Sequence, residues 1–241
     1  PRTGKSMGES CEDMAKKWQI RREDQDLLAY ESHQKAAAAY ARGFYSDLVM
    51  PLRGVDKDNI LRPDTTLEKL ATLKPAFDKR SGNGTLTAGN STNLSDGASA
   101  ALLSSEAWAQ ANGKEIQAYL VDAQVAAVDF VAGEGLLMAP AWAVAQLLKR
   151  NNLKLQDFDF YEIHEAFAAQ VLCTLKAWES EEFCKTKLGM DGALGSIDRS
   201  KLNVVGSSLA LGHPFAATGA RIVATAAKLL KEKGQGRALI S

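Results

Sequence analysis

Segments with the patterns of strands and helices alternate through the second half of the chain, and this alternation restricts the fold more than any other feature. Residues 115–126, "EIQAYLVDAQVA", alternate in hydrophobicity as a half-buried strand does. Residues 140–152, "PAWAVAQLLKRNN", have the spacing of an amphipathic helix. The order continues with a strand and helix over 158–178, a strand and loop over 201–214, a helix over 217–234 and the start of a strand at 237–241. This order predicts a layered α/β architecture.

The first half of the chain contains helices separated by irregular segments. Helices are predicted over 8–20 and 22–43, where good helix formers dominate. Residues 46–80 carry prolines and mixed charges, so we expect a long surface excursion. The small apolar residues of 98–105 predict a buried strand or the start of a helix, and 104–113 predicts a short helix.

Composition argues against several classes of protein. The chain has 29 basic and 29 acidic residues, so nothing predicts a nucleic-acid or membrane-surface partner. It has no apolar run long enough to span a bilayer and no signal-peptide pattern at its start. The 3 cysteines, Cys11, Cys173 and Cys184, are widely spaced without a CxxC pair, which argues against a disulfide scaffold and a zinc site.

One of the chain's 3 histidines, His213, lies in "LALGHPFAATGAR", where a predicted strand runs out and a helix begins. Ligands bind at that edge of a layered α/β sheet. Gly212 and its neighbouring glycines permit close backbone approach. The positive end of the helix dipole disfavours imidazolium, so a neutral His213 could accept a proton as a general base. The alternative is a structural histidine that hydrogen-bonds a nearby carbonyl.

A second histidine, His164, lies at another strand–helix junction, in "EIHEAFAAQ". His164 and Glu165 are adjacent, so they cannot share one face of a helix. The pair resembles the start of the HExxH zinc motif, but position 168 is Ala, so we expect no metal. The alternative interpretation makes Glu165 a charge at the helix N-terminus and His164 a capped core residue.

Three stretches in this order, "LTAGNSTNLSDGASA", "IHEAFAAQ" and "GHPFAATGAR", closely resemble the thiolase family, and the similarity runs over essentially the whole chain. The stretches "SMGES" and "RREDQDLLAYESHQKA" are similar to that family's inserted loop domain. The "HEAF" form and the Phe of "GHPF" resemble the β-subunit thiolases of the fatty-acid β-oxidation trifunctional complex. The resemblance implies the layered αβαβα thiolase fold, here partial, with a mostly helical inserted loop domain.

The resemblance also implies roles for particular residues. His213 matches the histidine that deprotonates a nucleophilic cysteine and then helps to hold the thioester oxygen. His164 would join it in donating hydrogen bonds to an enolate or oxyanion. Thr92 aligns with a hydroxyl residue that touches the pantetheine arm of coenzyme A, an ordinary turn residue being the alternative. The remaining substrate or coenzyme A contacts implied are Ser91, Glu165, Ala166, Phe167, Gly212 and Met7, of which Met7 has a core position as its alternative.

The same resemblance divides the chain into a loop domain over 1–80, the last segment of the N-terminal domain over 81–113 and a C-terminal domain over 114–241. The family needs a nucleophilic cysteine and a second cysteine that shuttles a proton. None of the 3 cysteines matches either position. We therefore expect an incomplete chain, truncated before its last cysteine loop and inactive alone, with the nucleophile outside these residues.

The activity implied is that of an acetyl-CoA C-acyltransferase, in which coenzyme A cleaves a 3-ketoacyl-CoA to acetyl-CoA and a shortened acyl-CoA. Coenzyme A would be a co-substrate, with no further cofactor. The resemblance also implies a homodimer or larger oligomer, a possible hydratase/dehydrogenase α-subunit, and a place in the bacterial cytoplasm or the mitochondrial matrix. The alternatives are an acetoacetyl-CoA-forming thiolase and a non-catalytic thiolase-like acyl-CoA-binding protein; ketoacyl synthases fit the quoted motifs less well.

Overall fold

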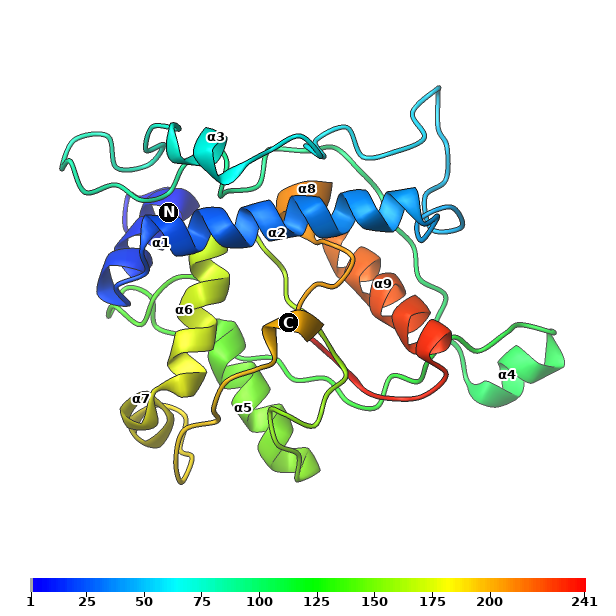
Figure 1. The fold of residues 1–241 in the computed structure, drawn as a ribbon. Coiled ribbons are helices and arrows are strands. Elements are labelled where there is room, and N and C mark those ends of the chain that lie inside the picture. The colour runs from blue at the N-terminus through cyan, green and yellow to red at the C-terminus, as the bar shows by residue number, and fades with distance from the viewer. Residues whose placement is uncertain (1) are drawn as a thin grey trace.

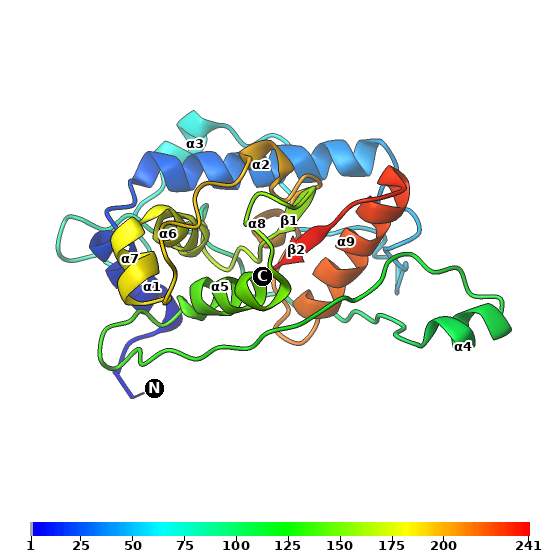
Figure 2. The same cartoon turned by 90° about the horizontal axis from the view of Figure 1, so that it is seen from below.

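The computed structural model describes residues 2–241 (Figure 1), in which helices pack around a short parallel sheet (Figure 2). The helices are α1 (Met7–Lys17), α2 (Arg22–Ala41), α3 (Leu67–Ala71), α4 (Glu106–Ala111), α5 (Ala139–Asn151), α6 (Ala168–Glu179), α7 (Glu181–Thr186), the 3-10 helix η1 (Arg199–Lys201), α8 (Ser208–Leu211) and α9 (Thr218–Lys233). The strands are β1 (Phe160–Glu162) and β2 (Ala238–Ile240).

The helices predicted over 8–20 and 22–43 form where their end signals lie. At the start of α1, Ser6 Oγ accepts from Glu9 N at 3.2 Å and Glu9 Oε2 accepts from Ser6 N at 2.7 Å. This reciprocal pair satisfies two backbone donors that the first turn of a helix leaves free. Gly43, at φ +77°, follows the last turn of α2 and lets the chain turn away. Both predicted helices are confirmed.

The core lies along α6, between α2 on one side and α5 on the other (Figures 1 and 2). α6 packs against α1, α2, α5 and α7. Trp178 of α6 is fully buried, and its indole N–H donates to Ala141 O of α5 at 3.3 Å. Small residues such as Ala169 and Ala177 are also fully buried on α6, which lets these helices approach closely.

The two strands form a parallel pair that positions the second half of the chain. Phe160 lies opposite Ala238 and Glu162 opposite Ile240. α9 leads into β2 and packs against both strands (Figure 2). The pairing continues past β1, because His164 N donates to Ser241 O at 2.6 Å. His164 therefore lies beyond the carboxyl end of β1, the edge of a parallel sheet at which ligands bind.

Three segments predicted as strands do not form strands in the structure of residues 2–241. Residues 98–105, for which the start of a helix is the alternative, and residues 115–126 form no strand. Residues 201–206 form a single parallel bridge, between Leu202 and Tyr161 of β1, and otherwise a 3-10 turn and bends ahead of α8. A strand needs the backbone groups of a neighbour over several residues. Residues 98–105 and 115–126 lie outside the sheet of β1 and β2, and the segment after 201 pairs with β1 at Leu202 alone. The predicted burial of 98–105 is also wrong, since Leu102 and Leu103 are 72% and 70% exposed.

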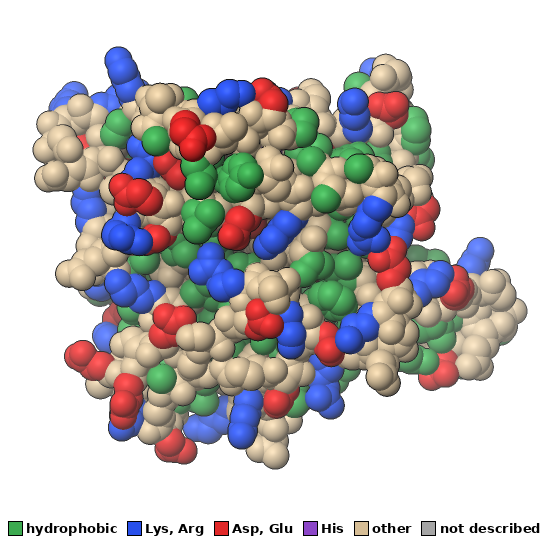
Figure 3. Space-filling model, in the orientation of Figure 1, with side chains coloured by type: hydrophobic (Ala, Val, Ile, Leu, Met, Phe, Trp, Pro, Cys, Tyr) green, Lys and Arg blue, Asp and Glu red, His purple; other side chains and the backbone are tan. Residues whose placement is uncertain are grey.

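Residues 97–131, which we name the apolar arm, carry α4 away from the rest of the molecule (Figures 2 and 3). Val121 and Val125 are 86% and 87% exposed. Apolar surface of this extent is typical of a face that another segment or protein covers. Its exposed large apolar side chains are Leu102, Leu103, Trp108, Tyr119, Leu120, Val121, Val125 and Val131.

Candidate active site

Two imidazole rings face each other where β1 and α8 end. His164 follows β1, and His213 lies between α8 and α9. Their ring centroids are 4.0 Å apart, with 48° between the ring planes. The ring of Phe215 lies 4.9 Å from that of His213 on the exposed side. The structure thus brings together the two histidines that the sequence motifs single out.

Thr218, the first residue of α9, holds the His213 ring. Nδ1 of His213 lies 2.8 Å from Thr218 Oγ1, and that hydroxyl donates to Pro214 O at 3.3 Å. A hydroxyl has one hydrogen, so His213 Nδ1 donates to Thr218 and Nε2 carries the free lone pair. Burial, and then the positive charge of Arg221, lower the pKa of His213. A lowered pKa favours the neutral imidazole that the sequence predicts, with burial as the largest cause.

The His164 ring is held from the opposite side by α8. Its Nδ1 lies 2.7 Å from Ser208 Oγ, and Ser208 is fully buried. Nε2 of His164 is buried and has no hydrogen-bond partner among residues 2–241. Burial, then the neighbouring His213 and Arg221, lower the pKa of His164 to about 3. This imidazole is therefore neutral at physiological pH.

Glu165 anchors the loop behind the histidine pair. Its carboxylate accepts from Ser32 Oγ of α2 at 2.8 Å, from Asn203 Nδ2 at 2.6 Å and from Leu209 N of α8 at 3.2 Å. Burial raises the pKa of Glu165, and these three hydrogen bonds oppose the rise. Ser32 Oγ also accepts from Ser207 N at 3.1 Å. Glu165 therefore ties α2, α8 and the loop after β1 into one unit.

The loop with Ser91 and Thr92 is joined to the segment that follows Glu165. Thr92 donates to Ala166 O from its backbone N at 2.9 Å and from Oγ1 at 3.2 Å. Ser91 forms an isolated antiparallel bridge with Phe167. These bonds fix the distance between the two loops, so the residues that follow Thr92 are brought toward His213.

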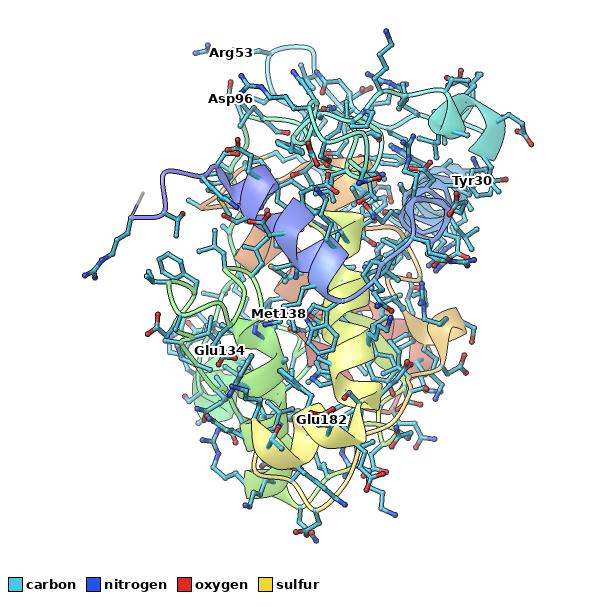
Figure 4. The ribbon with its side chains drawn as sticks, turned by 90° about the vertical axis from the view of Figure 1, so that its left-hand side faces the viewer. Tyr30, Arg53, Asp96, Glu134, Met138 and Glu182 are labelled. Carbon is cyan, nitrogen blue, oxygen red and sulfur yellow. The ribbon has the colours of Figure 1, made fainter. Side chains whose placement is uncertain are left out.

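An open hollow of about 310 Å³ lies in front of His213. Gly212 lies beside the hollow, close to the lining residue Ser95. At its φ of +91°, an added Cβ would lie 2.9 Å from Ser95 Oγ and from Ile60 Cδ1. Only glycine adopts this backbone angle and this proximity without strain. Asp96 lies near one end of the molecule, well away from the core residue Met138 (Figure 4). The hollow is lined by Leu94, Ser95, Asp96, His213 and Phe215.

The predicted site residues fall into three groups. His164, His213 and Gly212 lie at or directly beside the hollow. Ser91, Thr92, Glu165, Ala166 and Phe167 form the framework behind it and do not line it. Met7 is the first residue of α1, is 44% exposed and does not line the hollow.

Sequence reasoning missed the side chains that hold the two rings. Ser208, Thr218 and Arg221 contact the histidines or their partners, yet each has the appearance of an ordinary helix residue. The available signal was the spacing in "HPFAATGAR", which places Thr218 and Arg221 three residues apart and so on one face of a helix.

None of the three cysteines lies at the hollow. Cys11 of α1, Cys173 of α6 and Cys184 of α7 are all buried. Burial raises the pKa of Cys11 and raises that of Cys173 to about 12, so neither forms a thiolate readily.

Residues 2–241 contain no cluster of three or more His, Cys, Asp or Glu side chains arranged to hold a metal ion. In the same residues, no helix combines the length and the apolar character needed to cross a bilayer.

Comparison with known proteins defines the class. Residues 2–107 match the thiolase N-terminal domain and residues 114–241 match the thiolase C-terminal domain. The chain therefore belongs to the thiolase family, and the resemblance predicted from the sequence motifs is confirmed. The finer division at residues 80 and 113 stays a prediction.

Particular relatives place the chain within that family. It is 45% identical to the 3-ketoacyl-CoA thiolase of Shewanella baltica and 44% identical to that of Shewanella loihica, in each case over 98% of this chain and 55% of the relative. An acetyl-CoA acetyltransferase of Bacillus anthracis has a similar structure, with a TM-score of 0.79 and 36% identity over 98% of this chain and 56% of that one. The thiolase-like α/β fold is confirmed, and the chain spans about half the length of these relatives.

Proposed function

We propose that these residues form the histidine-bearing part of an acetyl-CoA C-acyltransferase, a 3-ketoacyl-CoA thiolase of fatty-acid β-oxidation. The observation that supports it most is the pairing of His164 with His213, with ring centroids 4.0 Å apart beside an open hollow. Burial keeps both rings neutral near pH 7, and the lone pair on His213 Nε2 suits a general base. The relatives named 3-ketoacyl-CoA thiolase support the same activity.

In the proposed reaction, His213 removes the proton from a cysteine thiol that these 241 residues do not supply. A thiol with a pKa near ~8.5 is a weak nucleophile until it loses that proton. The sulfur attacks the 3-keto carbon of the substrate, and the C2–C3 bond breaks with its electron pair on C2. The proton that His213 took from the thiol ends on C2, which releases acetyl-CoA and leaves the shortened acyl group on sulfur.

Coenzyme A then completes the cycle. Its sulfur bonds to the acyl carbon, the bond from that carbon to the cysteine breaks, and the proton from the coenzyme A thiol returns to the cysteine sulfur. His164 would donate a hydrogen bond to the oxygen that gains negative charge in each half-reaction. We propose coenzyme A as co-substrate and no further cofactor. Gly212 is the proposed contact of the substrate and coenzyme A, with Ser91, Thr92, Glu165, Ala166 and Phe167 shaping the pocket from behind.

We also infer an assembly larger than one chain. The apolar arm exposes Val121 and Val125 almost completely, which supports a partner surface. A homodimer or larger oligomer, with a subunit carrying hydratase and dehydrogenase activities, is the proposed assembly. Bacterial relatives favour the bacterial cytoplasm over the mitochondrial matrix as its location. Size-exclusion chromatography with light scattering tests the oligomer, and a single-chain mass would contradict it.

An acetoacetyl-CoA-forming thiolase is the second candidate. The acetyl-CoA acetyltransferase of Bacillus anthracis supports it, with a TM-score of 0.79. A non-catalytic acyl-CoA-binding protein is the third, supported by the burial of all three cysteines.

The test is a thiolysis assay on the complete polypeptide to which these residues belong. We expect cleavage of 3-ketoacyl-CoA substrates of several chain lengths, and loss of kcat by a factor of about 10² to 10⁴ in His213→Ala, the range for a general base. Thiolysis confined to acetoacetyl-CoA would favour the second candidate. Binding of acyl-CoA without turnover would favour the third, and an unchanged rate in His213→Ala would refute the assigned base.

A further inference from the structure

We propose that Ser208 and Arg221 fix the tautomer of His164, so that this ring presents Nε2–H as a hydrogen-bond donor. The role of this donor in catalysis rests on the proposed thiolase function. The tautomer itself can be tested without measuring turnover. Arg221 Nη2 lies 2.8 Å from Ser208 Oγ, and Ser208 Oγ lies 2.7 Å from His164 Nδ1. The three side chains form a single hydrogen-bonded line from α9 through α8 to the loop after β1.

Proton counting along this line favours one arrangement, because a His164 Nδ1–H donating to Ser208 would leave the serine hydroxyl hydrogen without an acceptor. A guanidinium has donors and no acceptor, so Arg221 donates to Ser208 Oγ. Ser208 has one hydroxyl hydrogen, and His164 Nδ1 is the neighbour that can receive it. A neutral imidazole that accepts at Nδ1 carries its own hydrogen at Nε2. The direction of the hydrogen bonds is therefore set at the arginine, because a guanidinium can donate but cannot accept.

The line ends in a donor that has no partner. Nε2 of His164 is buried and unpaired among the residues that the structure describes. Buried polar groups are nearly always paired, and an unpaired one signals a missing ligand or water. The centroid of the His213 ring lies 4.0 Å from that of the His164 ring, and His213 borders the hollow. An oxygen that develops negative charge, such as that of a thioester or an enolate, is the acceptor that would match this N–H.

The first turn of α9 holds both histidines, with opposite proton placement. Thr218 receives Nδ1–H of His213, which leaves Nε2 of that ring as an acceptor. Arg221, three residues further along the same helix, acts through Ser208 to make Nε2 of His164 a donor. The two neighbouring rings therefore have different roles, His213 as a base and His164 as a hydrogen-bond donor. Ser208 and Arg221 are positioning residues, because neither borders the hollow.

The tautomer is measured directly by NMR of ring nitrogens in the complete polypeptide labelled with ¹⁵N-histidine, without any need for turnover. Signals of His164 are assigned by their loss in His164→Gln. We expect His164 to show a protonated Nε2 and an unprotonated Nδ1. A protonated Nδ1 in the unmodified protein would overturn the proposal, even if the protein is a fully active thiolase.

Variants then test the line itself. Ser208→Ala removes the hydroxyl, and we expect the His164 spectrum to move toward an average of both tautomers. Ser207→Ala is the matched control, because Ser207 is the adjacent buried serine and its hydroxyl has no partner within residues 2–241. Equal spectra for Ser208→Ala and the unmodified protein would overturn the proposal.

A second pair of variants separates the charge from the packing. Arg221→Lys keeps a cationic donor, whereas Arg221→Met removes it at similar length. We expect His164 to remain in the Nε2–H tautomer in Arg221→Lys. In Arg221→Met we expect a mixture of the two His164 tautomers. In thiolysis, Ser208→Ala and Arg221→Met should lower kcat about 10-fold or more with little change in KM, as for an interaction made in the transition state. A loss confined to KM, or equal loss in both Arg221 variants, would contradict the assigned role.

Discussion

Glu162, the last residue of β1, leads to a prediction about stability and pH. Its side chain is fully buried, and neither carboxyl oxygen has a hydrogen-bond partner within residues 2–241. Burial raises the pKa of Glu162 from 4.5 to about 8, with Glu165 adding to the rise and Arg221 and Lys35 opposing it. The folded protein therefore holds this proton at pH values where the unfolded chain has released it.

The sign of the effect follows from the proton count. Between about pH 4.5 and 8 the folded state binds more protons at Glu162, so stability falls as pH rises through that window. With those two pKa values, the cost is about 1 kcal/mol at pH 5 and about 3 kcal/mol at pH 7. Glu162→Gln has nearly the same shape and cannot ionise, so it removes this part of the pH dependence.

The assay is urea unfolding of both proteins at about pH 5 and about pH 7. We expect the unfolding free energy of Glu162→Gln, relative to that of the unmodified protein, to be greater at the higher pH by about 2 to 3 kcal/mol. Any cost of the unpaired amide does not change with pH, so it cancels in this difference. Identical pH dependence of the two proteins would refute a protonated Glu162 in the folded state.

Three further predictions concern other parts of the molecule. Ser6→Ala removes the cap of α1 and should lower the unfolding free energy by about 1 kcal/mol in urea titrations, so an unchanged midpoint would contradict the capping box. Gly212→Ala should destabilise by about 1 to 3 kcal/mol, because φ is +91° and the new Cβ would press on Ile60; equal stability would show that the turn can relax. Arg221→Met removes a charge that lowers the pKa of His213, so the NMR titration midpoint of His213 should rise toward 6.5, and a fall would contradict this electrostatic account.

The sequence predicts well those elements whose causes are local. α5 begins beside Pro140 and ends at Asn152 in the left-handed conformation, as its end signals indicate. Hydrophobic and polar residues alternate over 115–126 as in a strand, but this segment forms no strand. Strand formation depends on a neighbouring backbone, which the local sequence does not provide. The prediction that 98–105 is buried is wrong for the same reason, because the pattern of this segment does not determine which residues cover it.

The candidate site also contains residues that local sequence signals predict and residues that they do not. His164 and His213 are predictable because glycine, proline and strand–helix junctions mark their loops. The contact of Ser208 with His164 joins residues far apart in the chain, and nothing in the local pattern of "GSSLAL" indicates which serine makes it. The order of the hydrogen bonds to Arg221 depends on side-chain geometry and proton counting, which become available only with the coordinates.

The close packing of α2 against the segment before α8 matters when segments are exchanged between thiolases. Gly206 passes so near this helix that a methyl group there would meet Ala36 Cβ at 2.5 Å and Ser32 O at 2.6 Å. Ser32 also joins Glu165 to the backbone of Ser207. No residue of α2 borders the hollow, yet a graft that replaced 22–41 would reset the spacing of both histidine loops. Loss of activity in such a chimera would then result from displacement of the histidine loops, although His164 and His213 themselves would be unchanged.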